Sequence, residues 1–353
     1  MWCSAGRHLK SVVLFLYIIS SLFLLSSIFL IRSSILFMSN FWQTLPKPIM
    51  VLAPMADVTD ASFRRIIAKY GKPDVTWTEF VSADGLVRAS EIGKGKLMKD
   101  LIFSESERPI VAQLFSSHPE YMLEAAKLCK DLGFDGIDIN MGCPDKSIEK
   151  QGAGAAMIKH PEIARAIIRA AKEGSGLPVS VKTRVGYNSV ELETWLPQIL
   201  AESPAVVTIH ARTRKEMSKV PARWDHVRRA VEIRNELGSE ALIFGNGDVL
   251  DIEDAKMKAK ETGADGVMLG RAIFGNPWLF SKNSEPSLQE RLSVLLEHTK
   301  LFEELLGDTK SFALMKKHFK SYVNGFDNSK EVREKLMEAQ NSDDVARIIK
   351  GYN

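Results

Sequence analysis

Cysteine is scarce in this chain of 353 residues. Its three cysteines, Cys3, Cys129 and Cys143, offer no disulfide framework, and their odd number is typical of a reducing compartment. A large excess of charge is also missing, and a net charge of +3 indicates no nucleic-acid partner without local clustering. No G-x-G-x-x-G run opens a β-α-β unit, which disfavours a dinucleotide bound in a Rossmann fold.

One long uncharged run stands apart at the amino terminus. Residues 11–31 carry no charge and are long enough to cross a bilayer, which takes about 20 residues. A signal peptide is less suitable, because its apolar core spans only about 7–15 residues and ends in a cleavage site of small residues. Two interpretations stay open for residues 1–37: a membrane anchor, or a leader that is not translated because the protein begins at Met38. Neither belongs to the catalytic fold.

From residue 48 onward, short apolar runs rich in β-branched residues alternate with longer amphipathic stretches. This alternation is typical of a parallel sheet with helical crossovers. Eight such repeats predict a (β/α)₈ TIM barrel over residues 38–285 rather than an open sheet. The predicted strands are Ile49–Ala53, Val75–Phe80, Ile110–Phe115, Gly136–Asn140, Val179–Thr183, Ala205–His210, Leu242–Asn246 and Gly266–Gly270. Residues 286–353 show only helical patterns and predict a small, separate helical domain.

Polar or special side chains follow strand after strand. In a barrel the carboxyl ends of all strands meet at one mouth, where barrel enzymes carry their active sites. A strand-end lysine that reaches solvent and a hydrogen-bonded core histidine are the ordinary alternatives for Lys182 and His210. Because polar or special residues stand at all eight predicted strand ends, a functional site is favoured over these ordinary alternatives. The residues concerned are Pro54, Met55, Ala56, Glu79, Gln113, Asn140, Cys143, Lys182, His210, Asn246, Gly247, Asp248, Gly270 and Arg271.

The glycine turns after the last two predicted strands indicate a phosphate site. Backbone amides at Asn246–Asp248 and the guanidinium of Arg271 are suitable donors for an anion at this part of a barrel. On the opposite wall, the Gln113 amide matches the pyrimidine edge of an isoalloxazine, and Lys182 would stabilise negative charge on a reduced flavin. Together these features point to FMN in the barrel mouth.

Cys143 stands where a predicted strand breaks at Gly142 into a turn before the next helix. A free cysteine is most often a small buried hydrophobe. The strand, turn and helix around it instead resemble the way in which α/β enzymes present a catalytic group. A thiol with an ordinary pKa of about 8.5 is mostly protonated at neutral pH, so it can donate a proton.

Several motifs resemble those of the tRNA-dihydrouridine synthases. They occur in the family's order across roughly residues 48–325: APMADVTDASFR (Ala53–Arg64), DINMGCP (Asp138–Pro144), VKTRVG (Val181–Gly186), HARTR (His210–Arg214), GNGDV (Gly245–Val249) and GVMLGRAIFGNPW (Gly266–Trp278). The tail KKHFKSYVNGF resembles that family's RNA-binding domain. The hydrophobic leader departs from the family's usual soluble form.

The resemblance implies reduction of the C5–C6 double bond of uridines in tRNA, with NADPH or NADH reducing FMN first. Hydride would pass from flavin N5 to uracil C6, and Cys143 would give a proton to C5. Asn140 would pair with the uracil edge, and Arg184 and Arg212 would meet RNA. The implied FMN-binding residues are Pro54, Met55, Ala56, Gln113, Lys182, His210, Asn246, Gly247, Asp248, Gly270 and Arg271.

Two clusters of basic residues support an RNA substrate. The segment from Arg212 to Arg229 holds seven basic residues against two acidic ones. In the tail, Lys316 and Lys317 stand beside His318 and Phe319, and such basic groups interleaved with aromatics suit phosphate contact and base stacking. A solvated charged face is the ordinary alternative. The target uracil would be everted into the pocket.

Two other functions stay open at this point. A flavin barrel acting on a free pyrimidine, similar to dihydroorotate dehydrogenase, would share FMN and the fold, and a membrane anchor suits some members of that family. A non-catalytic RNA-binding barrel is the other. The catalytic domain is expected in the cytoplasm, because tRNA, NADPH and reduced thiols occur there, and residues 11–31 would tether it to a membrane if they are inserted.

Overall fold

The computed structural model describes residues 40–281 and 286–352. The chain divides into two compact units, residues 1–44 and 45–353. Of the first unit, the described part holds one 3-10 turn, η1 (Phe41–Gln43). The predicted membrane-spanning run at 11–31 and the alternative start at Met38 lie outside the described residues. Across residues 40–281 and 286–352, no helix combines the length and the apolar character needed to span a bilayer.

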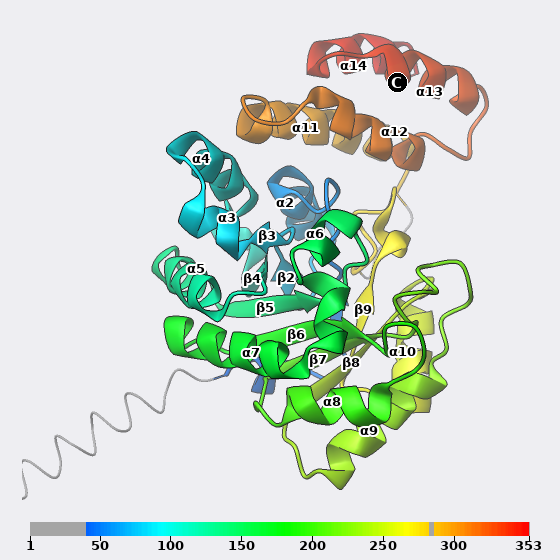
Figure 1. Ribbon diagram of the computed structural model, residues 1–353. Coiled ribbons are helices and arrows are strands. Elements are labelled where there is room, and N and C mark those ends of the chain that lie inside the picture. The colour runs from blue at the N-terminus through cyan, green and yellow to red at the C-terminus, as the bar shows by residue number, and fades with distance from the viewer. Residues whose placement is uncertain (1–39, 282–285, 353) are drawn as a thin grey trace, which may run out of the picture. The chain divides into compact units, whose positions relative to one another are not determined.

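The second unit contains a closed barrel of parallel strands, which confirms the predicted fold (Figure 1). Its sheet runs in the order β1-β9-β8-β7-β6-β5-β4-β2, with β3 also on β4, and a bridge between Val51 and Val75 joins the two ends. The strands are β1 (Ile49–Leu52), β2 (Thr76–Trp77), β3 (Val81–Ser82), β4 (Ile110–Phe115), β5 (Gly136–Met141), β6 (Val179–Arg184), β7 (Val206–His210), β8 (Leu242–Asn246) and β9 (Gly266–Leu269).

The second predicted strand, Val75–Phe80, is a regular strand only over β2, and the short β3 begins just after its predicted end. Between them the Thr78 hydroxyl accepts the backbone N–H of Gln113 at 3.0 Å. A side chain thus takes the place of a backbone acceptor in the ladder, and the chain leaves the regular strand over residues 78–80. Glu79 lies in this break.

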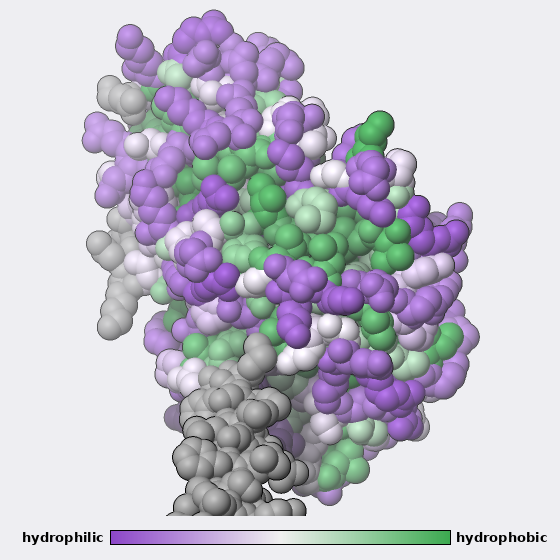
Figure 2. Space-filling model, turned by 90° about the vertical axis from the view of Figure 1, so that its left-hand side faces the viewer, coloured by the Kyte–Doolittle hydropathy of each residue, from purple (hydrophilic) through white to green (hydrophobic). Residues whose placement is uncertain are grey.

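Helices surround the barrel and follow the strands as predicted. They are α2 (Ala61–Tyr70), α3 (Ala83–Arg88), α4 (Glu91–Asp100), α5 (Pro119–Asp131), α6 (Lys146–Lys150), α7 (Pro161–Ser175), α8 (Leu192–Leu200), α9 (Asp225–Glu236) and α10 (Ile252–Thr262), with 3-10 turns η2 (Glu105–Glu107), η3 (Gly154–Lys159) and η4 (Arg271–Ile273). The face shown in Figure 2 carries many hydrophilic residues with hydrophobic patches between them. Polar outer faces are what helices packed on a sheet require.

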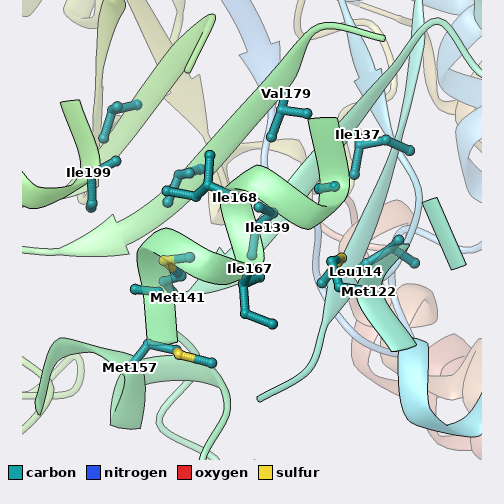
Figure 3. Close-up of a cluster of buried hydrophobic side chains, with 14 of the residues drawn as sticks. Leu114, Met122, Ile137, Ile139, Met141, Met157, Ile167, Ile168, Val179 and Ile199 are labelled. Atoms are coloured by element: carbon teal, nitrogen blue, oxygen red, sulfur yellow. The ribbon is translucent and has the colours of Figure 1, made fainter. Parts of the chain in front are cut away.

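Alternation along β5 separates the core from the site. Ile137, Ile139 and Met141 are buried outside the barrel against α5 and α7, in the cluster of Figure 3. Each buried aliphatic side chain of this kind contributes about 1.5–3 kcal/mol. Because successive residues of a strand point to opposite faces, Asp138 and Asn140 point into the barrel instead. The same strand therefore holds the wall of the barrel and supplies part of its mouth.

The carboxyl-terminal residues are helical, as predicted. They form α11 (Leu288–Leu306), η5 (Phe312–Met315), α12 (Lys316–Tyr322), α13 (Ser329–Glu338), α14 (Ser342–Ile349) and η6 (Lys350–Tyr352). A capping box between Ser287 and Glu290 starts α11. These helices share one hydrophobic cluster with Ile66 of α2 and Trp278. The domain boundary after residue 285 stays a prediction.

Candidate active site at the barrel mouth

The carboxyl ends of the strands open into a cavity of about 690 Å³. Most of the predicted site residues line it: Pro54, Met55, Gln113, Asn140, Cys143, Lys182, Arg184, His210, Arg212, Asn246, Gly247, Asp248, Gly270 and Arg271. Four do not. Glu79 lies between β2 and β3 outside the lining, Ala56 is an exposed turn residue, and Lys316 and Lys317 lie on α12.

A chain of hydrogen bonds crosses the floor of the cavity from β5 to β4 and back. The Gln113 amide donates to Asp138 at 2.6 Å, and the Asn140 amide donates to the Gln113 oxygen at 3.1 Å. The Asn140 oxygen then accepts the N–H of Gly142 at 3.1 Å and the N–H of Cys143 at 2.9 Å. Because an ionised carboxylate only accepts, Asp138 fixes which way each amide points. One N–H of Asn140 and one of Gln113 are left for a ligand.

Two groups of opposite charge lie at this floor, the buried Asp138 and the half-buried Lys182. Burial raises the pKa of Asp138 to about 6, although Ser180 and Gln113 donate hydrogen bonds to it. Burial lowers the pKa of Lys182 to about 8, and Arg184 lowers it further. Within the described residues Lys182 has no ion pair or hydrogen bond of its own. A cation held in a cavity without a partner is a strong indication of an anionic or electron-rich ligand.

The Cys143 thiol is half-buried on the cavity wall. Its backbone carbonyl accepts the N–H of Ala155 at 2.9 Å, so the turn is held from both sides. Burial raises the pKa of the thiol, despite the nearby charges of Lys182 and Arg184. The thiol therefore keeps its proton at neutral pH, as a proton donor must. Cys129 is fully buried in α5 and belongs to the core.

His210 at the end of β7 is a neutral imidazole. Burial lowers its pKa well below the ordinary value, and the cations of Lys182, Arg184 and Arg212 add to the shift. The Nη1 of Arg212 lies 3.2 Å from Nε2 of His210. A guanidinium only donates, so Nε2 accepts this bond and Nδ1 carries the proton. His210 can thus donate from Nδ1.

The turns after β8 and β9 bring Asp248 and Arg271 together. The Asp248 carboxylate accepts from Arg271 at 2.7 Å, from the N–H of Ala222 at 2.9 Å and from Arg212. Arg212 lowers the pKa of Asp248, so this group is charged. The neighbouring Gly247 has a φ of +125°, and a Cβ there would lie 2.8 Å from Ala222. Glycine is required at this turn by its backbone and by its neighbours.

The two arginines predicted to meet RNA also make hydrogen bonds within the protein. Arg184 donates to the carbonyls of Gly142 at 2.7 Å, Thr213 at 3.0 Å and Met217 at 3.0 Å. Arg212 donates to the Val220 carbonyl at 2.6 Å besides its contacts with His210 and Asp248. Both are almost fully buried. These contacts hold the loops around the cavity, and the contact of both arginines with RNA stays a prediction.

The basic loop between Arg212 and Arg229 is less basic than its composition indicates. Arg214 pairs with Glu149, Arg223 with Glu216, and Arg229 with three glutamates. Among the described residues, the cations of this loop without a carboxylate partner are Lys215, Lys219 and Arg228. On α12, Lys317 lies 3.2 Å from Asp57, whereas Lys316 has no partner in the part of the chain that the structure describes.

The structure also brings in residues that the sequence analysis did not assign to the site. Phe80, Ser218, Val249, Leu250 and Ala272 line the cavity. Asp138 supports its floor. Asp138 could have been found, because it lies two residues before Asn140 on a strand and must share its face. Ser218 and Leu250 lie in loops and carry no such signal.

Comparison with known proteins gives one consistent family. The sequence profile described as "Dihydrouridine synthase (Dus)" matches residues 51–350. "Probable tRNA-dihydrouridine synthase 2" of Bacillus subtilis (strain 168) is 40% identical over 316 residues, 89% of this chain and 96% of that protein. "Probable tRNA-dihydrouridine synthase" of Staphylococcus epidermidis (strain ATCC 35984 / DSM 28319 / BCRC 17069 / CCUG 31568 / BM 3577 / RP62A) is 40% identical over 313 residues, 88% of this chain and 95% of that protein.

A solved structure of 2-naphthoyl-CoA reductase in complex with 2-naphthoyl-CoA is similar in fold. It superposes with a TM-score of 0.50 and 13% identity, covering 66% of this chain and 49% of that chain. At this identity the likeness concerns the fold alone.

Proposed function

The chain belongs to the dihydrouridine synthase family, and from this premise we propose that it reduces the C5–C6 double bond of uridines in tRNA, with FMN as cofactor and NADPH or NADH as reductant. The observation that carries the proposal is the placement of the Cys143 thiol on the wall of a cavity that also holds Lys182, a cation without an ion pair among the described residues. Neither group is needed for a purely structural barrel.

The residues of the cavity suit FMN. Its volume of about 690 Å³ lies within the usual range for cofactor sites. Lys182, the Nδ1–H of His210 and the free N–H of Gln113 are donors for the heteroatoms of a flavin ring. The turns at Gly247 and Gly270, with Arg271, would hold the phosphate. When bound, FMN supplies the hydride that reduces the pyrimidine.

The protein's own groups then divide the remaining work. Cys143 keeps a proton at neutral pH and donates it to C5 of the pyrimidine. The free N–H of Asn140 is available to a uracil carbonyl, while its oxygen holds the turn of Cys143. Lys182 would stabilise negative charge on the reduced flavin, because a half-buried cation acts more strongly than one in bulk water.

The carboxyl-terminal helices would bind the tRNA outside the cavity. Lys316 and Lys320 on α12 and Lys215 and Lys219 beside the mouth are the cations that we assign to phosphate contact. Lys317 contributes less, because Asp57 already neutralises part of its charge. The uridine must leave its stack to reach Cys143, so base eversion is part of the proposal.

The test is reduction of unmodified tRNA by the purified protein with NADPH, with dihydrouridine read by mass spectrometry. Free orotate and free uracil are the matched substrates in parallel assays. We expect bound FMN, turnover of tRNA, and no turnover of the free bases. Turnover of a free base alone would replace the proposal by a reductase of free pyrimidines. A protein that binds no flavin would favour the non-catalytic alternative.

A further inference from the structure

We propose that Lys310, which lies outside the cavity in the carboxyl-terminal helical segment, is a positioning residue for the loop 54–60 that lines the cavity, and that it acts through Glu79. The inference rests on the proposed function only for the identity of the ligand, FMN. Its structural part concerns this chain alone.

The loop after β1 is a compact turn with one unusual residue. The carbonyl of Met55 accepts the N–H groups of Val58 at 3.1 Å and Thr59 at 3.0 Å, and the Thr59 hydroxyl accepts the N–H of Met55 at 2.9 Å. Asp57 has a φ of +55°, in the left-handed region that non-glycine residues rarely adopt. The backbone N–H of Asp57 finds its acceptor outside the loop, because it donates to a side-chain oxygen of Glu79.

Glu79 connects this turn to the helical segment. Its other oxygen accepts from the Lys310 ammonium at 2.8 Å, and Lys310 also lies 2.7 Å from Asp100. The side chains of Glu79 and Lys310 are only 6% and 16% exposed. The path from the helical segment to the cavity thus has three steps: Lys310, Glu79, and the backbone of Asp57 two residues from Met55.

Lys310 is needed because Glu79 is buried. Burial raises the pKa of Glu79, and the charge of Lys310 counteracts this rise. An ionised carboxylate offers acceptors on both oxygens, whereas a protonated one turns one oxygen into a donor. Without Lys310, Glu79 would take up a proton or turn toward water. Either change would weaken its hold on the left-handed turn at Asp57.

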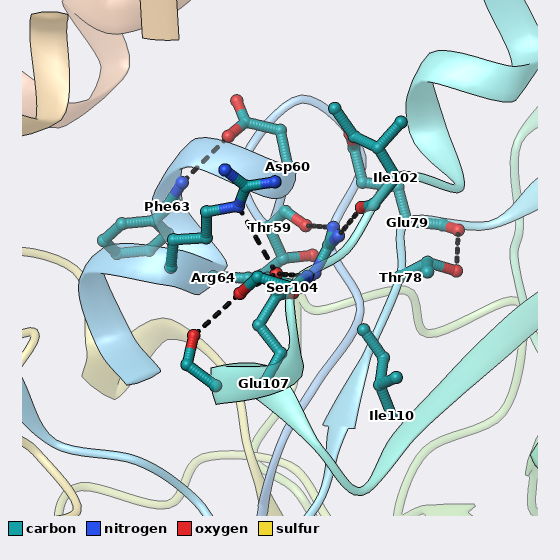
Figure 4. A network of polar contacts seen from close by, with 12 residues as sticks. Thr59, Asp60, Phe63, Arg64, Thr78, Glu79, Ile102, Ser104, Glu107 and Ile110 are labelled. Carbon is teal, nitrogen blue, oxygen red and sulfur yellow. Dashed lines mark hydrogen bonds and ion pairs between the residues drawn. The ribbon is translucent and has the colours of Figure 1, made fainter. Parts of the chain in front are cut away.

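The other end of the loop is held independently of the helical segment. Arg64 is fully buried and donates to the Thr59 carbonyl at 2.9 Å, to the Ile102 carbonyl at 2.6 Å and to Glu107 at 2.7 Å (Figure 4). These partners all belong to the barrel. Loss of Lys310 should therefore loosen the turn at Asp57 without unfolding the loop as a whole.

Other ion pairs between the barrel and the helical segment provide matched controls. Lys99 pairs with Asp308 at 3.0 Å, and Lys69 pairs with Glu297 at 2.6 Å. Both ion pairs join the barrel to the helical segment, as Lys310 does. In the described structure no residue of either pair forms a hydrogen bond or ion pair with the loop 54–60. Lys317 reaches the side chain of Asp57, at a more exposed position.

The experiment compares Lys310→Met with Lys99→Met in the full chain. Hydrogen exchange of peptides spanning residues 54–60 in the flavin-free protein reports the loop, and fluorescence titration reports FMN affinity. We expect faster exchange of this loop and FMN binding weakened about tenfold in Lys310→Met, with both unchanged in Lys99→Met. Wild-type exchange and wild-type FMN affinity in a folded Lys310→Met protein would overturn the inference.

A double variant covers the case in which Lys310→Met does not fold. Glu79→Gln combined with Lys310→Met removes both charges, and the introduced amide oxygen accepts the N–H of Asp57 without a counter-ion. We expect this double variant to fold. Hydrogen exchange of residues 54–60 should be slower than in Lys310→Met and faster than in wild type. The reference is the double variant Glu79→Ala, Lys310→Met, which has no side-chain acceptor at position 79. If residues 54–60 exchange as fast in the glutamine variant as in this reference, the inference is overturned. A wild-type protein that binds no FMN would end the proposed function instead, while the exchange comparison still tests Lys310.

Discussion

The side-chain oxygen of Asn140 accepts the backbone N–H of Cys143 at 2.9 Å. The same oxygen accepts the N–H of Gly142, and the amide nitrogen of Asn140 is held by Gln113. The side chain of Asn140 is therefore bonded to the backbone of Gly142 and Cys143, and these hydrogen bonds fix the direction in which the Cys143 side chain leaves the backbone. Asn140 has two tasks: it shapes the turn with its oxygen and offers one N–H to the cavity.

Replacing Asn140 by alanine should reduce turnover while FMN stays bound. The change leaves two backbone N–H groups without an acceptor and frees the turn that carries the thiol. Displacement of a catalytic group by about 1 Å can cost about a hundredfold in rate, and we expect a loss of that order. Steady-state kinetics on tRNA, with flavin content from the absorption spectrum, give the measurement. Unchanged turnover would mean that other contacts hold the turn.

Replacing Cys143 by alanine should abolish dihydrouridine formation and leave the flavin in place. A positioned general acid contributes about 10²–10⁴-fold, and Cys143 is the only thiol among the described residues that line the cavity. Mass spectrometry of tRNA after long incubation checks the loss. If the variant loses its flavin together with its activity, Cys143 has a structural role.

The barrel and the composition of its mouth were predictable because they follow from local patterns. The β-branched runs and amphipathic stretches determine a βα repeat, and closure of the repeat brings distant strand ends such as Gln113 and Arg271 to one cavity. The alternation in DINMGCP orients Asn140 inward. These inferences need only the period of a strand and the direction of a parallel sheet.

Charge pairing was not predictable, because partners come from distant parts of the chain. Arg214 is neutralised by Glu149, which lies on α6, and Arg212 by Asp248. From sequence these arginines appeared available to RNA. The early end of the second predicted strand before Thr78 likewise depends on a side chain that replaces a backbone acceptor. The contact of Lys310 with Glu79 joins residues 231 positions apart and has no local signal.

Removal of a free cation on α12 should weaken tRNA binding in a salt-dependent way. Lys316→Ala removes a cation without a partner among the described residues, so one phosphate contact is lost. The slope of log affinity against log salt should then fall by about 0.7–0.9. Arg229→Ala is the control, because Glu193 and Glu236 already neutralise this arginine at 2.7 Å each. Binding titrations at several salt concentrations decide the matter; equal slopes in wild type and Lys316→Ala would remove α12 from the RNA contact.

The stability of the protein should fall between pH 7 and pH 5 because a histidine of α12 is buried against α2 and α11. His318 is 2% exposed and lies with its ring 4.7 Å from those of Phe63 and His298. Burial lowers its pKa to about 4, whereas an unfolded histidine has a pKa of about 6.5. Between these values the unfolded chain binds more protons. The contribution of His318 is therefore complete above about pH 6.5 and is lost as the pH falls toward 4.

From pH 7 to pH 5 this linkage amounts to roughly 2 kcal/mol of unfolding free energy for His318 alone. His298 is shifted in the same direction by burial, and Asp60 opposes the shift of His318. His318→Phe keeps the ring contact with Phe63 and removes the titrating group, so its stability should depend less on pH. Urea unfolding of both proteins at pH 7 and pH 5 separates this effect from the protonation of carboxylates, which both proteins share. If the two proteins lose the same free energy of unfolding over this interval, His318 is not the group that titrates, and its burial beside Phe63 serves packing alone.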